Sequence, residues 1–332
     1  MPYFQPKLTL PSSLPFRDKT ILITGTSAGL GLAATKHLLL HGAKEVIAGV
    51  RSVAKADAVN ADILSDRELK RVNPDGKITV LRLDAEDYSS VLHFVSEVKT
   101  RWDGNLDMVL LNAGTGSLKW EVAGKTGHEK TIQVNVLSPA LLALELLPVL
   151  EKTASRTGVP SRLTWVGSFV QFDHSLEKKP VRAGEGAVAH FDDKSQFVAM
   201  ARYPDSKLLG TLFVEELAKH VDPEKVIVND VSPGMVKTGF GNYPGWLRFL
   251  FAGIFAFKGR DVDEGVKTYL YALGVAGKES HGSYLSDNTV ARRAPFTQTA
   301  AGTEVREKLW NDIWEECLGV DGSLERRTRT YV

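Results

Sequence analysis

The residues best placed to do chemistry in this chain are Tyr203 and Lys207, which stand four positions apart. Positions i and i+4 of a helix share one face, so the phenol and the ammonium group would point into the same space. A nearby ammonium favours the phenolate and lowers the pKa of a tyrosine from its usual value of about 10. A tyrosine tuned in this way can exchange a proton with a carbonyl or alcohol oxygen. Taken alone, the spacing fits a solvated lysine beside a half-buried tyrosine equally well.

A second candidate site is the glycine-rich turn after the first apolar segment. Residues 20–24 are rich in β-branched side chains, which is typical of a buried strand, and a helix is predicted over 32–40. Between them the turn contains Gly25, Ser27, Gly29, Leu30 and Gly31. Glycines let the backbone approach a diphosphate, and a helix N-terminus adds N–H groups and partial positive charge. The pattern therefore predicts a dinucleotide site, against the alternative of a purely structural strand-to-helix turn.

The end of the second predicted strand bears on cofactor selectivity. This strand covers 45–50 and is followed by Arg51. An acidic residue at that position would bind the ribose 2′-hydroxyl of NAD, whereas an arginine suits the 2′-phosphate of NADP. Glu45 lies at the opposite end of the strand and cannot take the acidic role. The sequence therefore favours NADP(H) over NAD(H), unless Arg51 simply begins a solvated loop.

The composition narrows the class of protein. The chain has 332 residues and a formal net charge of +1, with 43% hydrophobic and 24% charged residues, which is ordinary for a globular protein. The sequence has no basic tract for nucleic acid, no Cys/His cluster for a metal and no signal-peptide core. Its single cysteine, Cys317, excludes an intrachain disulfide. We therefore expect a cytoplasmic protein that acts on a small molecule without a metal.

Strand-like segments alternate with helical ones along the chain. Further strands are predicted over 78–83, 106–111, 162–167, 225–230 and, briefly, 283–285. Helices are predicted over 131–150, interrupted near Pro139, and over 203–220. This alternation predicts an α/β protein with a single Rossmann-like, doubly wound parallel sheet and helices on both faces.

The carboxyl ends of the predicted strands carry residues suited to a cofactor site. Ligands of such sheets bind beyond these ends, where the sequence has Gly25, Arg51, Asp84, Asn112, Ser168 and Pro233. Agreement among several strand ends is stronger evidence than any one motif. Structural alternatives remain open, because Ser168 and Asp84 could cap the segments that follow them and Asn112 could be a turn residue.

With these residues assembled, the chain resembles a short-chain dehydrogenase/reductase from about residue 19 to residue 237. The resemblance rests on the glycine turn, Asp84, Asn112-Ala113-Gly114, Asn135, Ser168, Tyr203 with Lys207, and Pro233-Gly234 with Val236 and Thr238. Among members of the family, the chain looks most like fungal proteins near the retinol-dehydrogenase-like branch. Some of those proteins tailor polyketides and other secondary metabolites.

The resemblance implies a catalytic set of Asn135, Ser168, Tyr203 and Lys207. Tyr203 would donate the proton when a carbonyl is reduced, and Ser168 would hydrogen-bond the substrate oxygen. Lys207 would hold the nicotinamide ribose and lower the pKa of Tyr203. Asn135 would anchor a water that relays protons to Lys207, although it could also be a helix-kink residue without that role.

The resemblance also implies how the cofactor is held. The backbone at Asn112, Ala113 and Gly114 would line the cofactor, and Asp84 would meet the adenine. The segment Pro233, Gly234 and Val236 would shape the nicotinamide pocket, and Thr238 would bind the carboxamide or a phosphate.

The chain departs from the family pattern just ahead of the tyrosine helix. Pro204 and Asp205 follow Tyr203, so this helix is expected to start late or to kink. An insertion at about 173–200 lengthens the approach to it. Many members of the family pair through this helix, and an insertion there would cover the pairing surface, which favours a monomer over a dimer.

The expected organisation is an N-terminal arm over 1–18 and one domain over 19–332. A strongly apolar segment at about 239–260 resembles the substrate lid of the family and favours a bulky apolar or aromatic substrate. A helix buried in the core and a helix lying on a membrane surface are the alternatives for this segment.

The leading hypothesis is an NADPH-dependent oxidoreductase that reduces a ketone or aldehyde, or oxidises an alcohol in reverse. A second hypothesis keeps the cofactor for non-redox dehydration, isomerisation or cyclisation. A third, a non-catalytic nucleotide sensor or scaffold, predicts loss of catalytic residues, and the sequence retains all four. Fold alone does not choose among these functions.

Overall fold

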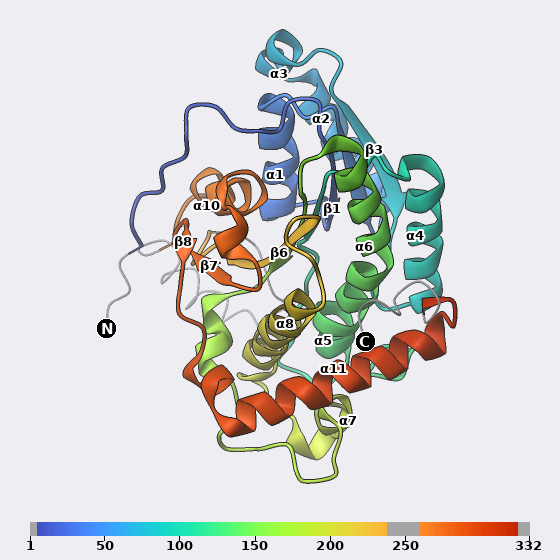
Figure 1. The fold of residues 1–332 in the computed structure, drawn as a ribbon, viewed down its shortest axis with the longest axis vertical. Helices are drawn as coiled ribbons and strands as arrows, with labels where there is room; N and C mark the ends of the chain where they lie inside the picture. Colours follow the sequence, from blue (N-terminus) through green and yellow to red (C-terminus); the bar gives the residue numbers. More distant parts are fainter. Residues whose placement is uncertain (1–4, 238–258, 325–332) are drawn as a thin grey trace.

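A parallel sheet organises the computed structural model, which describes residues 5–237 and 259–324 (Figure 1). The strands lie in the order β3-β2-β1-β4-β5-β6-β7-β8, and all neighbours are parallel except β7 and β8. Their bounds are β1 Thr20–Thr24, β2 Glu45–Val50, β3 Lys77–Arg82, β4 Met108–Leu111, β5 Ser161–Val166, β6 Val226–Ser232, β7 Tyr284–Ser286 and β8 Thr289–Val290. The predicted doubly wound α/β fold is confirmed.

The central strands are buried along their whole length, because helices cover both faces of the sheet. The apolar runs of β1 and β4 fit this burial. The strand order reverses between β1 and β4, which is the switch point where ligands of such sheets bind. The glycine turn after β1 and the segment after β4 therefore meet at one place.

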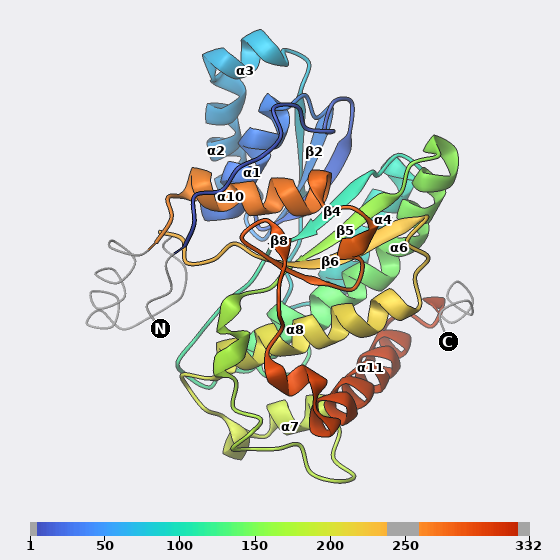
Figure 2. The same cartoon turned by 60° about the vertical axis from the view of Figure 1, so that its left-hand side comes forward.

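Helices form layers on the two sides of the sheet (Figure 2). One apolar cluster joins the sheet to α4, α6 and α8, and a second joins it to α1, α2, α3 and α10. The helix bounds are α1 Gly29–Leu40, α2 Val53–Ser65, α3 Arg67–Val72, α4 Tyr88–Trp102, α5 Lys130–Ile132, α6 Ser138–Thr157, α7 Ala187–Asp192, α8 Arg202–Lys219, α10 Val262–Leu270 and α11 Ala300–Val320.

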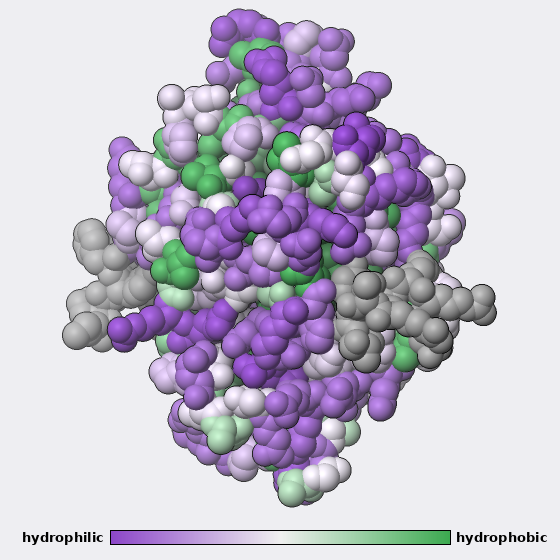
Figure 3. All heavy atoms as spheres, in the orientation of Figure 1, coloured by the Kyte–Doolittle hydropathy of each residue, from purple (hydrophilic) through white to green (hydrophobic). Residues whose placement is uncertain are grey.

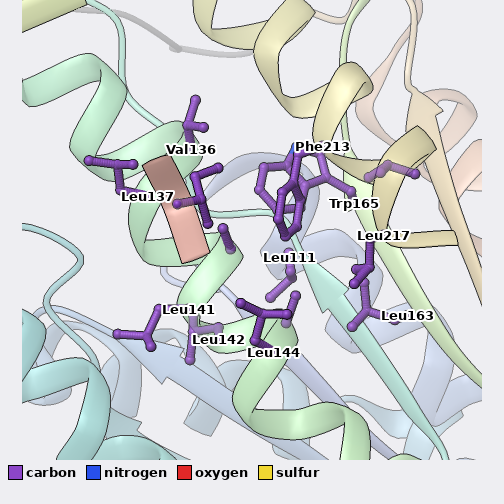
Figure 4. Packing of buried hydrophobic residues seen from close by; sticks show 14 of the residues in the cluster. Leu111, Val136, Leu137, Leu141, Leu142, Leu144, Leu163, Trp165, Phe213 and Leu217 are labelled. Atoms are coloured by element: carbon purple, nitrogen blue, oxygen red, sulfur yellow. The ribbon is translucent and has the colours of Figure 1, made fainter. Parts of the chain in front are cut away.

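The larger cluster packs α6 and α8 against the middle of the sheet (Figure 4). Leu141 from α6 and Leu217 from α8 are fully buried there, and Trp165 of β5 lies 5.5 Å from Phe213, centroid to centroid. Truncating one such leucine to alanine typically costs about 2–5 kcal/mol of folding free energy. This packing fixes how α8 lies over β5 and β6.

The long helix after β4 is interrupted earlier than the sequence predicts. Pro139 is the second residue of α6 and follows a π-helical turn within one continuous helical stretch. The interruption is instead a π-helical turn over Gln133–Leu137, which widens the helix by one residue. The predicted break near Pro139 was therefore misplaced by a few residues.

Helix α8 does not start late or kink at Tyr203. It begins at Arg202, which places Pro204 in the first turn, where a proline needs no hydrogen bond. The predicted late start or kink of α8 is therefore wrong, because a proline in the first turn does not disturb a helix.

Strand β8 was missed because it is short and exposed. It pairs with β7 through a two-residue turn at Asp287 and Asn288, whose φ angles of 53° and 59° are those of a type I′ turn. An Asp-Asn pair tolerates this left-handed conformation and is the local signal for the hairpin.

Helix α11 forms an additional layer over α8 (Figures 1 and 2). Trp310 stacks on Phe213 of α8 with ring centroids 5.8 Å apart. Arg306 of α11 lies 3.1 Å from Glu215 and 2.9 Å from Glu216, both on α8. Apolar stacking and these ion pairs together hold α11 along the outer face of α8.

One helix and one face of the described structure are relevant to whether the protein contacts a membrane. The stretch Lys130–Thr157 is long and apolar enough to cross a membrane, but 94% of its most apolar window is buried, as in a core helix. Figure 3 shows a mostly hydrophilic face with small, separate apolar patches. The predicted lid at 239–260 lies outside the described residues except for its last two positions.

His128 joins three parts of the chain that are far apart in sequence. Its Nδ1 lies 2.7 Å from Asp192 Oδ2 at the end of α7, and its Nε2 lies 3.1 Å from Glu316 Oε1 on α11. Burial alone would lower the pKa of His128, but the two carboxylates outweigh burial and raise it to about 9.

We expect the contribution of His128 to stability to depend on pH. Its folded-state pKa of about 9 exceeds the unfolded value near 6.5, so the stabilisation is complete below pH ~6.5 and is lost as pH rises through about 9. Urea unfolding should make His128→Gln less stable than wild type by about 2 kcal/mol at pH ~6, and by much less at pH ~10. An equal difference at both pH values would contradict this account.

Candidate active site

Helix α8 carries Tyr203 and Lys207 beneath the end of β5. Lys207 Nζ donates a hydrogen bond of 2.8 Å to the carbonyl of Val166 and lies 5.4 Å from the centroid of the Tyr203 ring. The lysine side chain is almost completely buried, and burial lowers its pKa to about 8, although Asp230 opposes this shift. The two residues share one face of the helix, as the sequence predicted.

Ser168 lies two residues after Val166, the last residue of β5, whose carbonyl accepts from Lys207. Its Oγ accepts a hydrogen bond of 3.3 Å from the N–H of Val170 and caps the 3₁₀ turn Phe169–Asp173. The capping alternative is therefore present in the structure. Capping uses the oxygen as acceptor, so the hydroxyl proton can still be donated to a ligand.

Asn135 lies within the π-helical turn and connects it to two other segments. Its side-chain amide donates to the Thr115 carbonyl at 2.8 Å and to Ser206 Oγ at 2.9 Å, and its Oδ1 accepts from the Thr115 N–H. Ser206 in turn donates to the Tyr203 carbonyl at 2.7 Å. Asn135 thus ties the segment after β4 to the turn of α8 that carries the tyrosine.

Gly114 brings Asn135 and Lys207 to the same space. A Cβ atom placed on Gly114 would lie 3.3 Å from Asn135 Oδ1 and 3.9 Å from Lys207 Nζ. A larger residue there would fill the gap between the amide and the ammonium. The two polar groups therefore face one small volume beside the strand end.

The glycine turn after β1 has the geometry of a nucleotide cradle. Gly25 has φ of 77°, and a Cβ on Gly31 would lie 2.2 Å from the Gly25 carbonyl oxygen, so neither position accepts a side chain. Helix α1 begins at Gly29 without a side-chain cap or an acidic residue in its first turn. The buried hydroxyl of Thr26 has no hydrogen-bond partner among the described residues. These features fit the diphosphate of a dinucleotide.

Asn112 joins β4 to β1 beneath this turn. Its side-chain amide donates to the carbonyls of Thr24 and Gly25 at 2.8 and 3.1 Å, and its Oδ1 accepts from the Tyr269 hydroxyl at 3.0 Å. Ala113 N–H donates to Thr24 Oγ1 at 2.9 Å. Asn112 is therefore more than a turn residue, because it holds the two strand ends of the switch point together.

Arg51 and Asp84 lie at the outer edge of the site. The Arg51 side chain is 71% exposed, and its Nη1 lies 3.3 Å from Glu86 Oε1. Asp84 accepts from the Glu86 N–H at 3.2 Å, whereas the cap of α4 is Asp87, which accepts from the Ser89 N–H. The alternative that Asp84 caps this helix is thus wrong.

The segment after β6 is held by the N-terminal arm. Gly234 has φ of 76°, and Gln5 bonds both backbone groups of Met235, at 2.7 and 3.0 Å. Val236 pairs with Arg260 in an isolated bridge. Thr238, the last predicted cofactor residue, lies outside the described residues.

Buried charge fixes the start of α8. Arg202 is fully buried against Phe191 and Phe197, and its Nε lies 3.9 Å from Glu129 Oε2. Asp205 accepts from the backbone N–H and hydroxyl of Ser175 at 2.6 and 2.9 Å, and burial raises its pKa to about 6. The insertion at 173–200 is thereby attached to the helix that carries Tyr203.

Two residues of the site were not singled out from the sequence. Ser206 stands between Tyr203 and Lys207, so its place on the helix was the available signal. Tyr269 of α10 is buried, burial raises its pKa, and it reaches Asn112 across 157 positions of chain, which no local pattern reveals. Within the described ranges, no group of three or more His, Cys, Asp or Glu residues is arranged to hold a metal.

Comparison with known proteins gives matches along most of the chain. The short chain dehydrogenase family model matches residues 19–159. The chain is 42% identical to the short chain dehydrogenase macD of Penicillium terrestre, covering 94% of this chain and 95% of that protein. It is also 42% identical to the short chain dehydrogenase yanD of Aspergillus niger, covering 95% and 96%, and 39% identical to the short-chain dehydrogenase/reductase tropG of Talaromyces stipitatus, covering 95% of each.

Solved structures agree in fold. An NADPH-bound carbonyl reductase from chicken fatty liver superposes with a TM-score of 0.58 at 19% identity, covering 83% of this chain and 99% of that one. The NADH-dependent reductase A1-R′ with NAD gives 0.56 at 20% identity, covering 81% and 95%.

Proposed function

The chain belongs to the short-chain dehydrogenase/reductase family, and on that premise we propose that it is an NADPH-dependent oxidoreductase that interconverts a ketone or aldehyde with its alcohol. The observation that carries this proposal is the placement of Lys207, which faces the Tyr203 ring and bonds the strand end that leads into Ser168. A phenol and an ammonium group therefore lie on one helix face, and the backbone that binds the ammonium leads into the hydroxyl of Ser168. A non-catalytic role would not require a buried ammonium group beside the tyrosine ring.

In the proposed reaction, the reduced nicotinamide supplies the hydride and the chain binds, orients and moves a proton. Ser168 holds the substrate oxygen through its hydroxyl. Tyr203 donates its phenolic proton to that oxygen, and the ammonium of Lys207 stabilises the phenolate that remains.

The same proposal gives Lys207 and Asn135 roles in cofactor binding and proton supply. Lys207 holds the nicotinamide ribose, and Asn135 anchors a water that returns a proton towards Lys207. Support comes from the small volume beside Gly114 that both side chains face. Pro233, Gly234 and Val236 flank the nicotinamide, and Asp84 meets the adenine.

The selectivity for NADP(H) rests on Arg51. Both nicotinamide cofactors occur among proteins of this fold, so the choice depends on the residues of this chain. Arg51 is exposed, and its partner Glu86 also lies 3.2 Å from Lys130 Nζ. Arg51 can therefore leave Glu86 for a 2′-phosphate without stranding a carboxylate.

We propose a bulky apolar or aromatic substrate. Trp120, from the segment after β4, meets Phe197 of the insertion edge-on with centroids 5.6 Å apart, and Phe197 also lies against Arg202, next to Tyr203. Phe172 and Met200 are 47% and 60% exposed nearby in the chain. The fungal sources of the relatives fit a secondary-metabolite substrate, and a cytoplasmic location stays a prediction.

Deuteride transfer tests the reaction. We expect NADPH carrying deuterium at its transferable position to label a product from a panel of bulky ketones, aldehydes and quinones, as seen by mass spectrometry. Tyr203→Phe should lower the labelling rate by about a hundredfold or more, because it removes the proton donor. Tyr271→Phe, outside the site, should label normally. Conversion without label would favour the non-redox alternative, and labelling unaffected by Tyr203→Phe would exclude the assigned role.

Arg51→Ala tests cofactor selectivity. Loss of a charge-assisted contact to the 2′-phosphate should raise the Kd for NADPH about tenfold to a hundredfold while leaving that for NADH nearly unchanged. Lys55→Ala is the matched control, since Lys55 is exposed at the start of α2 and is expected to have little effect. Titration by cofactor fluorescence measures both values. Equal losses for the two cofactors would show that Arg51 does not read the phosphate.

We also propose a monomer, formed by one domain with residues 1–18 as an arm. The support comes more from α11 than from the insertion, because α11 covers the outer face of α8 and the insertion packs on α11 through Asp312 and Lys308. Sedimentation equilibrium should give a mass near 36.4 kDa at all concentrations tested. A stable dimer or tetramer would contradict this.

A further inference from the structure

A buried carboxylate stands in the apolar layer between the sheet and α8. Asp230 lies in the middle of β6 and is 1% exposed, and its neighbours on the same face, Val226 and Val228, belong to the large apolar cluster. Burying a carboxylate in such a layer is costly unless partners compensate for lost water. The strand itself would pack as well with an apolar residue, so the carboxylate calls for a separate explanation.

The carboxylate has one strong hydrogen bond and one close backbone neighbour. Thr211 Oγ1 lies 2.6 Å from Asp230 Oδ2. A Cβ on Gly167 would lie 2.1 Å from Asp230 Oδ1, so a glycine is required where the two strands meet. The backbone N–H of Gly167 faces the carboxylate and lowers its pKa, although Oδ1 lacks a hydrogen bond of normal geometry among the described residues.

These contacts place one peptide group between two opposite charges. The Val166 carbonyl accepts from the Lys207 ammonium at 2.8 Å, and the N–H of the same peptide, on Gly167, faces Asp230. The next residue along the chain is Ser168. Thr211 stands one helical turn after Lys207, and its hydroxyl lies 3.2 Å from the Lys207 carbonyl. The lysine, the serine and the carboxylate are therefore mechanically connected.

The charges also act on one another. Burial raises the pKa of Asp230 to about 6, while Thr211 and then Lys207 hold it down, so the carboxylate is ionised at neutral pH. Asp230 in turn supports the charged form of Lys207 against burial. Among the described residues, the Tyr203 ring faces Lys207, and Arg293 after β8 acts on Asp230 while it is paired with Glu215 at 3.2 Å.

Asp205 on α8 is a second buried carboxylate, and its contacts differ from those of Asp230. It is also buried, and burial raises its pKa to about 6, but its oxygens bond the backbone and hydroxyl of Ser175 and it faces Arg202. It holds the insertion in place, whereas the carboxylate that acts on the Lys207 ammonium is Asp230. The two carboxylates therefore differ in what they face rather than in burial.

We propose that Asp230 is a positioning residue for the reaction, which keeps Lys207 charged and fixes the Gly167 backbone that presents Ser168. The inference rests on the proposed function, because it concerns how the same site works. It adds an acidic residue beneath the Ser, Tyr, Lys and Asn set.

The decisive measurement is the titration of Lys207 itself. Protein labelled with ¹³C at lysine Cε would be titrated by NMR, and the Lys207 signal assigned by its absence in Lys207→Arg. Removing the negative charge in Asp230→Asn should lower the titration midpoint by about one pH unit, because the ammonium loses the supporting charge of Asp230. Asp205→Asn is the matched control and should leave the midpoint unchanged. An unchanged midpoint in Asp230→Asn would overturn the proposal.

A second variant, Asp230→Ser, keeps the test decisive if Asp230→Asn does not fold. Asp230→Ser is smaller and also lacks the charge, so it should shift the midpoint in the same direction. If Asp230→Asn does not fold, Asp230→Ser decides alone, and no shift refutes the inference. The titration needs no substrate, so it remains informative if no deuteride transfer is found. Where turnover is found, the alkaline limb of kcat should move to lower pH by the same amount in these variants and not in Asp205→Asn.

Discussion

The buried ammonium of Lys207 is the constraint on which the site depends. A charged amine that is almost completely removed from water has to be compensated by fixed dipoles and charges, or it loses its proton. Here the compensation is a strand-end carbonyl from Val166, with further support from Asp230. The lysine therefore ties α8 to the end of β5, which leads into Ser168, and the carboxylate of Asp230 on β6 supports its charge.

Two side-chain amides bond the backbone groups of the segments that follow β1 and β4. Asn112 bonds the carbonyls where β1 turns into the glycine cradle, and Asn135 bonds both backbone groups of Thr115. A buried polar network of this kind rigidifies its surroundings only when its members find partners. The π-helical turn at Gln133–Leu137 is what brings Asn135 into such a position.

The outer parts of the chain pack against α8, the helix that carries Tyr203 and Lys207, on the side away from the sheet. Arg202 and Asp205 anchor the insertion to the first turn of α8, and α11 covers the face that points away from the sheet. The helix is thus held by charge at its start and by aromatic packing along its length. Its tyrosine and lysine can keep a fixed orientation because the helix that carries them cannot shift.

The sequence by itself determined the sheet and supplied the candidate site residues, because both depend on local signals. β-Branched runs marked β1 and β2, the glycines marked the turn after β1, and a spacing of four placed Tyr203 and Lys207 on one helical face. Tertiary structure decided the rest. The π-helical turn, the bond from Tyr269 to Asn112 and the position of Asp230 beneath Lys207 all depend on how strands and helices pack across long stretches of chain. Local periodicity carries no information on such packing, since it is set by the register of distant elements and by the requirement to satisfy buried polar groups.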